Sequence, residues 1–190
     1  AKDLELEKIA EAVFNQKAKL HKIDTYVSKK SNNNIVNWHC DWADGSAKLE
    51  KNININHSSI KFFIYITDVQ SQNGSLGYIP NSHHVVKALC LLMIEKKIEY
   101  RTFWKLEDLR SQVVKNELKN LIIEKIGSEK LNLFIDNSKF IENNSKDTFK
   151  FDFVMKKGSV VIFDELGVHR GSMPSKTDRQ VLRFLYCKKF

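Results

Sequence analysis

A short run that is typical of a β-strand, residues 35–41, carries two polar side chains on one of its faces. His39 and Asp41 are two positions apart, and residues i and i+2 of an extended strand project from the same side. In a helix the same two side chains would point in nearly opposite directions. Trp38 and Cys40 fall on the other face, where we expect them to pack against apolar neighbours.

A second histidine far along the chain, His169 in the segment Gly-Val-His-Arg-Gly, could complete a metal-binding set with this pair. Two imidazoles and one carboxylate hold non-haem Fe(II) and leave coordination positions open for further ligands. The spacing His-x-Asp is short enough to arise by chance, so a histidine hydrogen-bonded within a core is the alternative interpretation of His39. Both interpretations stay open on these residues alone.

Alternating apolar residues predict strands in both the first and the last part of the chain. An amphipathic helix over residues 3–18 is expected to precede them. The expected strands cover residues 23–28, 35–41, 61–67, 76–79, 149–153, 159–163 (a buried strand) and 179–187. The last of these has two distinct faces, one with Leu182, Phe184 and Tyr186 and the other with Arg179, Val181, Arg183 and Leu185.

The segment between the two groups of strands, residues 85–144, has a helical pattern. Apolar residues from Leu109 to Ile126 follow a helical stripe, which predicts one long helix that ends at Gly127. This insertion separates the two halves of the expected ligand set. It could cover the open end of a barrel and select the substrate, or it could pack against the outer face of a sheet.

Four blocks, in this order, resemble the phytanoyl-CoA dioxygenase family. The blocks are the His-Cys-Asp run at residues 39–41, the strand and Asn-Gly turn at 61–74 with Pro-Asn-Ser-His at 80–83, the strand at 158–164, and His-Arg-Gly at 169–171 with Arg179. The resemblance implies a mainly β fold with helical additions, a double-stranded β-helix (jelly-roll, cupin-like) barrel. We expect a single domain over residues 1–190, with an N-terminal helix and the helical insertion at 85–144.

The same resemblance implies an enzyme that uses Fe(II), 2-oxoglutarate and O₂ and releases succinate and CO₂. His39, Asp41 and His169 would bind the metal, and Arg179 would bind the distal carboxylate of 2-oxoglutarate, with Arg183 in reserve and Ser172 as a further contact. His83 would be structural. Relatives that halogenate carry a small residue in place of Asp41, so its presence favours hydroxylation. Only 38 residues precede His39, and no upstream 2-oxoglutarate contact is assigned.

Composition limits the partners and the setting of the protein. The formal net charge is +8, but the lysines are dispersed, which favours a solvated basic surface over a nucleic-acid site. We expect a small-molecule substrate, for which the basic balance allows an anionic compound. Cys40, Cys90 and Cys187 are odd in number and scattered, which fits a reducing, cytoplasmic setting. No apolar run is long enough for a membrane span.

Two other functions remain open on the sequence. One is a nucleic-acid or protein hydroxylase on the same barrel, which the positive charge suggests. The other is a barrel that keeps its ligand set and binds without turnover. The sequence leaves the identity of the substrate and the oligomeric state undetermined.

Overall fold

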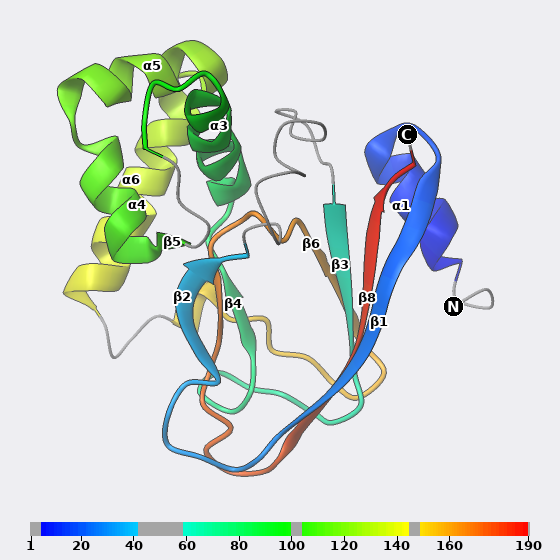
Figure 1. Ribbon diagram of the computed structural model, residues 1–190. Helices are drawn as coiled ribbons and strands as arrows, with labels where there is room; N and C mark the ends of the chain where they lie inside the picture. Colours follow the sequence, from blue (N-terminus) through cyan, green and yellow to red (C-terminus); the bar gives the residue numbers. More distant parts are fainter. Residues whose placement is uncertain (1–4, 42–58, 100–103, 145–148, 190) are drawn as a thin grey trace.

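Two four-stranded antiparallel sheets form the centre of the computed structural model, which describes residues 5–41, 59–99, 104–144 and 149–189 (Figure 1). Sheet A has the strand order β1-β8-β3-β6, and sheet B has the order β4-β7-β2-β5. The strands are β1 Ala18–Ser28, β2 Val36–Cys40, β3 Ser59–Tyr65, β4 Leu76–Tyr78, β5 Trp104–Lys105, β6 Val160–Phe163, β7 His169–Gly171 and β8 Arg179–Lys188. The helices are α1 Leu6–Phe14, α3 Ser82–Ile94, α4 Leu106–Val113, α5 Asn116–Ile126, α6 Ser128–Asn143 and the 3-10 helix η1 Phe149–Phe151.

The strands pair in a nested order, first with last. β1 pairs with β8, β2 with β7, and β3 with β6, all antiparallel. Inside these pairs, β4 is bridged to the segment after η1 through Gly77 and Asp152. Helices α3 to α6 are inserted between the two partners of this innermost pairing.

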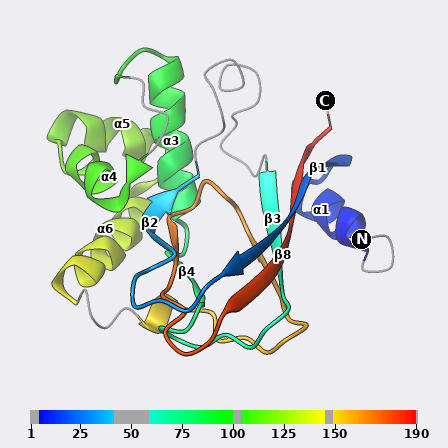
Figure 2. The same ribbon diagram turned by 60° about the horizontal axis from the view of Figure 1, so that its bottom comes forward.

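Helix α1, the amphipathic helix that the sequence predicts, packs on the outer face of sheet A. Its buried residues Leu6, Ala10 and Phe14 belong to one core cluster with Phe62 of β3 and Phe184 of β8. The predicted division of β8 into two faces is confirmed, because Leu182, Phe184 and Tyr186 pack in this cluster. Figure 2 shows α1 on the sheet A side and α3 to α6 on the side of sheet B.

The helical insertion packs against the outer face of sheet B. Cys40 of β2 and Val168 before β7 are fully buried in one cluster with Leu89, Leu109 and Ile122 of the helices. Trp38 is partly buried against the same cluster. The expected apolar face of β2 is therefore present, and within the described residues the insertion follows the second alternative, a pack on an outer face.

A third cluster fills the space between the sheets. It contains Tyr65, Leu76, Val161, Phe163 and Val181, which come from strands of both sheets. The molecule is thus built in layers, from α1 through sheet A, the interior and sheet B to the helical insertion. The inner faces of both sheets are buried in this arrangement, whereas most of β1 and the outer side of β6 stay exposed.

The prediction of one long helix up to Gly127 is wrong, because α4 ends at Val113 and α5 begins at Asn116. Leu106, Leu109 and Val113 form one apolar stripe, but the next buried residue, Leu118, follows five positions later. A step of five residues leaves the stripe of a straight helix. The break at residues 114–115 lets both helices bury their stripes in the same core. Gly127 does end α5, with a φ of 83°.

The strand expected at residues 149–153 is also absent, because residues 149–151 form η1. Phe151 is buried between Trp38 and Phe140, at ring-centroid distances of 5.9 and 6.0 Å, whereas Phe153 packs between the sheets. The two aromatic side chains therefore pack in different layers, Phe151 between sheet B and the helices and Phe153 between the two sheets. Strand-like bridges occur only after η1, at Asp152 and Met155.

Smaller differences concern the ends of elements. Helix α1 ends at Phe14, because Asn15 adopts a left-handed conformation with a φ of 51°. Strand β1 then begins at Ala18, five residues before the predicted start. Strand β6 is an edge strand rather than a fully buried one, and its Val160 and Ile162 are 38% and 43% exposed.

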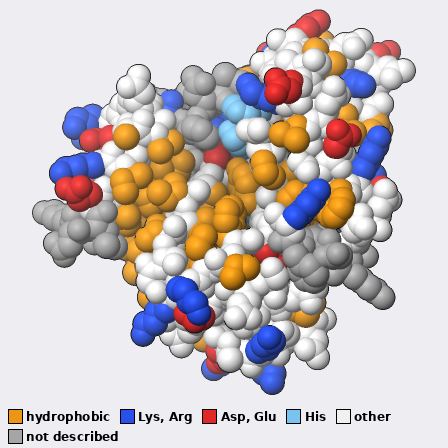
Figure 3. Space-filling model, turned by 180° about the vertical axis from the view of Figure 1, so that it is seen from behind, with side chains coloured by type: hydrophobic (Ala, Val, Ile, Leu, Met, Phe, Trp, Pro, Cys, Tyr) orange, Lys and Arg blue, Asp and Glu red, His pale blue; other side chains and the backbone are white. Residues whose placement is uncertain are grey.

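Val160 and Ile162 of β6 are among several large apolar residues of the described chain that are exposed. Figure 3 shows apolar side chains gathered on the face that is turned away in Figure 1. Among the described residues, no helix is both long enough and apolar enough to cross a membrane.

Candidate metal centre

Three side chains from the two ends of the chain converge on the inner face of sheet B. His39 on β2 lies directly opposite His169 on β7, and the centroids of the two imidazole rings are 4.4 Å apart. Asp41 follows β2, with its Oδ1 3.3 Å from Nε2 of His39 and its Oδ2 3.7 Å from Nε2 of His169. The candidate ligand atoms of the three residues all lie within 4.8 Å of one another.

The second nitrogen of each imidazole is held by the backbone. Nδ1 of His39 is 2.6 Å from the carbonyl oxygen of Asn37, and Nδ1 of His169 is 2.8 Å from the carbonyl oxygen of Gly167. A carbonyl can only accept, so each Nδ1 carries the proton and each Nε2 presents a lone pair. Metal-binding histidines are oriented in this way in general. The donor set and its orientation therefore fit a divalent metal ion such as Fe(II).

Burial and the local charges keep these groups in the forms that bind a metal. Burial lowers the pKa of His169 to about 4, although the nearby carboxylate of Asp41 raises it. Burial raises the pKa of Asp41, but the neighbouring imidazole of His39 and the positive charge of Lys61 outweigh that effect and hold it well below its ordinary value. At neutral pH, Asp41 is therefore ionised and His169 is neutral.

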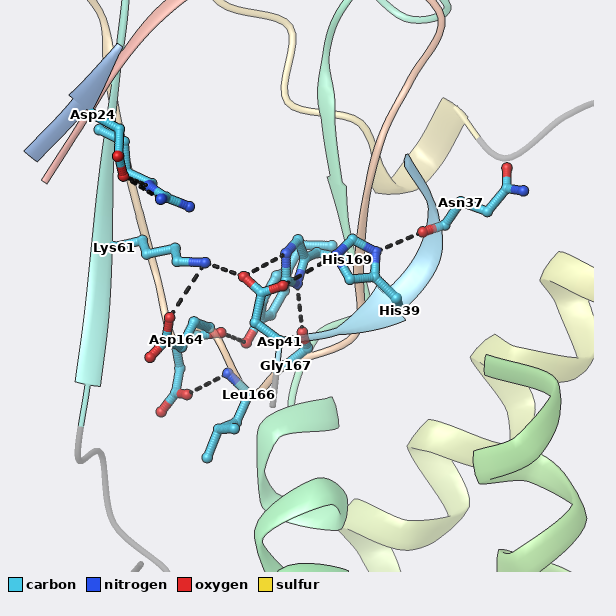
Figure 4. A network of polar contacts seen from close by, with 12 residues as sticks. Asp24, Asn37, His39, Asp41, Lys61, Asp164, Leu166, Gly167 and His169 are labelled. Atoms are coloured by element: carbon cyan, nitrogen blue, oxygen red, sulfur yellow. Dashed lines mark hydrogen bonds and ion pairs between the residues drawn. The ribbon is translucent and has the colours of Figure 1, made fainter. Parts of the chain in front are cut away.

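Lys61 brings a positive charge to this site from the opposite sheet. It is the third residue of strand β3, and only 3% of its surface is exposed. Its ammonium group donates a short hydrogen bond to Oδ2 of Asp41 (Figure 4). The same ammonium lies 3.3 Å from a carboxylate oxygen of Glu165. The backbone N–H of Asp41 in turn donates to the carbonyl oxygen of Glu165 at 3.1 Å.

The sequence interpretation missed Lys61 and Glu165. A signal for Lys61 exists, since it shares the alternation of Phe63 and Tyr65 and so lies on the inner face of an otherwise apolar strand. For Glu165 no comparable signal exists, because it lies in the loop between β6 and β7.

A cavity of about 190 Å³ lies between the three candidate ligands and the inner face of sheet A. Arg179 lines it from the first position of β8 and is only 7% exposed. Its guanidinium carbon lies 5.6 Å from the ring centre of Phe63 and 5.8 Å from that of Tyr65. Burial lowers the pKa of Arg179, although Tyr65 raises it.

Among the described residues, no carboxylate balances the charge of Arg179. Its Nε is buried without a hydrogen-bond partner, and no ion pair joins it to a carboxylate of the described ranges. A buried charge without a counter-ion is costly. Arg179 is therefore positioned to bind an anion in the cavity.

Arg183 and Ser172, the other two residues that the sequence analysis assigned to 2-oxoglutarate, already have polar partners in the protein. Arg183 also lines the cavity, but it forms an ion pair with Asp24 and stacks on Tyr26 at 4.8 Å. The hydroxyl of Ser172 is buried and lies 2.9 Å from the hydroxyl of Ser75.

His83, which we expected to be structural, lies at the start of α3 and is not part of the three-residue group. Its Nδ1 is 3.5 Å from the hydroxyl of Tyr78. That hydroxyl also donates to the carbonyl oxygen of Asp164 at 3.2 Å.

A fully buried ion pair supports the loop that carries Glu165. The ammonium of Lys87 on α3 lies 2.5 Å from Oδ2 of Asp164, and both side chains are at most 1% exposed. The other oxygen of Asp164 accepts the backbone N–H of Leu166 at 3.0 Å. Helix α3 is thereby fixed to the segment between β6 and β7, which positions both the Glu165 carbonyl and the Gly167 carbonyl.

Several solved structures have a similar fold. EvdMO1 matches with a TM-score of 0.55 and 14% identity, over 98% of this chain and 31% of that one. HygX from Streptomyces hygroscopicus with nickel, 2-oxoglutarate and hygromycin B bound matches with a TM-score of 0.51 and 17% identity, over 96% and 61%. The non-haem α-ketoglutarate-dependent epimerase SnoN from nogalamycin biosynthesis matches with a TM-score of 0.52 and 9% identity, over 96% and 52%.

This chain thus spans less than two thirds of the length of each of these three proteins. A sequence comparison with curated proteins finds no match. The model of the phytanoyl-CoA dioxygenase (PhyH) family matches residues 1–181, which confirms the resemblance of the four sequence blocks. The chain belongs to the phytanoyl-CoA dioxygenase family.

Proposed function

We propose that this chain is an Fe(II)- and 2-oxoglutarate-dependent oxygenase that acts on a small molecule. One observation carries the proposal: His39, Asp41 and His169 converge at a cavity whose other end holds the buried, unbalanced Arg179. A metal-binding set and an anion-binding residue in one cavity are what a metal with a dicarboxylate cosubstrate requires. Membership of the family supports the same function.

In this proposal His39, Asp41 and His169 hold the metal. Bound iron and 2-oxoglutarate supply the oxidising chemistry, in which 2-oxoglutarate is consumed to succinate and CO₂. The protein binds and orients these groups and shields them from water. HygX, a protein of similar fold, has structures with iron bound and with nickel and 2-oxoglutarate bound.

Arg179 is the proposed partner of the distal carboxylate of 2-oxoglutarate. An arginine fork can bind a carboxylate with two parallel hydrogen bonds. Arg179 is preferred to Arg183, because Arg183 already has Asp24 as its ion-pair partner. Ser172 is a weaker candidate, since its hydroxyl is engaged by Ser75.

We infer that the two sheets form a double-stranded β-helix. The nested pairing of β1 with β8, β2 with β7 and β3 with β6 supports this inference, because a jelly roll has eight strands in two antiparallel sheets. In this view the bridge between Gly77 and Asp152 represents the innermost pair. The helices are then an insertion into the tip of the rolled hairpin.

The substrate is proposed to lie in a second hollow beside the metal cavity. A groove of about 730 Å³ runs between β2 and helices α4 and α6, and Val36 and His39 line both the groove and the cavity. Small-molecule sites usually measure about 300–1,000 Å³, so the groove suits a substrate and the smaller cavity suits the cosubstrate. Arg110 and Glu142, which form an ion pair with each other in the groove, favour a polar substrate.

The reaction type is proposed to be hydroxylation. Asp41 takes the place of the small residue found in relatives that halogenate. SnoN, however, is described as an epimerase, so the product with a given substrate decides between hydroxylation and another oxidation.

The test is a titration of 2-oxoglutarate into the anaerobic Fe(II)-loaded protein, followed by exposure to oxygen. Binding should produce the charge-transfer absorption expected for the family, and oxygen should then release succinate, faster in the presence of a substrate from a metabolite panel. An iron-loaded protein that binds no 2-oxoglutarate would contradict the proposal. Binding without succinate would indicate a non-catalytic barrel, and stimulation by oligonucleotides or peptides alone would indicate the other hydroxylase function.

A further inference from the structure

Lys61 is a second buried cation in the metal cavity, and it contacts a proposed metal ligand. Its side chain reaches from β3 in sheet A to Asp41, which follows β2 in sheet B (Figure 4). Only 4% of the Lys61 side chain is exposed. No other described lysine lines this cavity.

Glu165 holds the opposite side of the same ammonium group. Its carboxylate lies 3.3 Å from Nζ of Lys61, and its backbone carbonyl accepts the N–H of Asp41. Asp41, Lys61 and Glu165 therefore form a closed set of contacts, in which one cation is shared by two carboxylates. A change in any one of the three charges must alter the electrostatic environment of the other two.

The charged groups that surround the metal cavity are equal in number and opposite in sign. The two carboxylates, Asp41 and Glu165, are matched by the two cations Lys61 and Arg179. A divalent metal and a dianionic cosubstrate add equal and opposite charges, so the loaded site would be balanced as well. With a neutral residue in place of Lys61, the site would carry one excess negative charge, which attracts a metal cation and repels an anionic cosubstrate.

We propose that Lys61 is a positioning residue that lowers the affinity of the site for the metal and raises its affinity for 2-oxoglutarate. Its ammonium competes with the metal for Oδ2 of Asp41 and, when the metal is bound, offsets the negative charge that 2-oxoglutarate brings next to Asp41 and Glu165. Glu165 limits both effects by sharing the ammonium. The inference rests on the function proposed above.

The experiment uses the full chain with Lys61→Met, which keeps an unbranched side chain but removes the charge. Mn(II) is titrated into the metal-free protein, and 2-oxoglutarate is then titrated into the Mn(II)-loaded protein. A tenfold change in affinity corresponds to about 1.4 kcal/mol, which is near the lower end of the strength of a hydrogen bond to a charged group. Mn(II) should therefore bind about tenfold more tightly and 2-oxoglutarate about tenfold more weakly.

Glu165→Gln should produce the opposite pair of changes, because Lys61 then acts on Asp41 alone. Mn(II) should bind more weakly and 2-oxoglutarate more tightly. Lys61→Arg keeps the charge and should change the 2-oxoglutarate constant less than Lys61→Met does. Lys156→Met is the matched control, since it removes an exposed lysine paired with Asp68 at 3.1 Å, and both constants should stay unchanged.

The opposite signs separate this proposal from a structural role. If Lys61→Met weakens the binding of both Mn(II) and 2-oxoglutarate, or changes neither dissociation constant, the proposal is wrong. If Lys61→Met does not fold, Glu165→Gln decides alone, and loss of affinity for both ligands in that variant would overturn it. A wild-type protein that binds Mn(II) but no 2-oxoglutarate would instead contradict the proposed function.

Discussion

At the scale of single residues, the proposed metal set depends on backbone carbonyls as much as on the proposed ligands themselves. The carbonyls of Asn37 and Gly167 each fix one imidazole so that Nε2 faces Asp41. The sequence could predict the three side chains, because a strand has a period of two and each ligand type has a known chemistry. The carbonyl contacts were not predicted, because they depend on the rotamer of each imidazole. The contact of Lys61 with Asp41 was not predicted either, because it depends on how the two sheets face each other.

His169→Ala should remove most of the metal affinity. Mutation of even an outer partner of a metal ligand costs about 10–100-fold in affinity, so loss of a ligand itself should weaken binding by more than about a hundredfold. The measurement is metal content after reconstitution with Fe(II) under anaerobic conditions. Unchanged metal content in this variant would remove His169 from the site.

Cys40→Ser should keep the metal, although Cys40 lies between two proposed ligands. Its side chain is fully buried in the cluster that joins sheet B to the helices. The expected result is wild-type metal content, measured as for His169→Ala. A folded Cys40→Ser protein that binds no iron would show that the thiol takes part in the site.

Arg179→Ala should weaken 2-oxoglutarate binding by at least about a hundredfold and leave metal binding nearly unchanged. Breaking a buried ion pair typically costs about 3–5 kcal/mol, and each 1.4 kcal/mol is about tenfold in affinity. Arg179→Lys should recover only part of the loss, because an ammonium group cannot reproduce the planar fork. The measurement is a 2-oxoglutarate titration of the anaerobic Fe(II) protein.

Arg183→Ala is the comparison for Arg179→Ala. It removes a cation that lines the same cavity but is already paired with Asp24. A loss of 2-oxoglutarate binding in Arg183→Ala, with normal binding in Arg179→Ala, would transfer the role to Arg183.

At the scale of elements, local patterns predicted the strands better than the helices. Strands β3 and β8 alternate clearly because each separates two different environments, α1 outside and the cavity inside. The break between α4 and α5 and the 3-10 turn η1 were missed because they depend on tertiary packing. Phe151 and Phe153 alternate in sequence, yet they pack in different layers.

Lys87→Met should destabilise the protein by about 3–5 kcal/mol, the usual cost of leaving one partner of a buried ion pair alone. Lys87 joins α3 to Asp164 in the loop before β7. The free energy of unfolding, measured with urea, should fall by that amount. Lys156→Met, which breaks an exposed pair, should change it by less than about 1 kcal/mol.

The double variant Lys87→Met with Asp164→Asn should recover much of this loss. Asparagine keeps an acceptor for the N–H of Leu166 but carries no charge that needs a partner. If Lys87→Met alone is as stable as the wild type, the ion pair does not fix α3 to this loop.

At the scale of the whole molecule, the site lies between the two sheets and draws residues from both. The proposed metal ligands come from or directly follow strands of sheet B, whereas Lys61 and Arg179 come from sheet A. The metal would therefore be held by one sheet, and 2-oxoglutarate would connect that sheet to the other through Arg179. Ligand binding should then stabilise the arrangement of the sheets in two separate steps.

Thermal unfolding should show these two steps. A ligand at 100 times its dissociation constant stabilises the folded state by about 2.7 kcal/mol, and 1 kcal/mol raises the melting temperature by about 2–4 °C for a chain of this size. Mn(II) alone should therefore raise the melting temperature by about 5–11 °C, and 2-oxoglutarate added to the Mn(II) protein should raise it by a similar amount. Without Mn(II), 2-oxoglutarate should have a smaller effect, because its oxo-acid end has no metal to bind.

Two variants assign the steps to the two sheets. His169→Ala should lose both shifts, because 2-oxoglutarate binding depends on the metal. Arg179→Ala should keep the Mn(II) shift and lose most of the 2-oxoglutarate shift, because only the contact with sheet A is removed. If Arg179→Ala shows the full second shift, 2-oxoglutarate does not connect the sheets through this arginine, and the cavity between Asp41 and Arg179 serves another ligand.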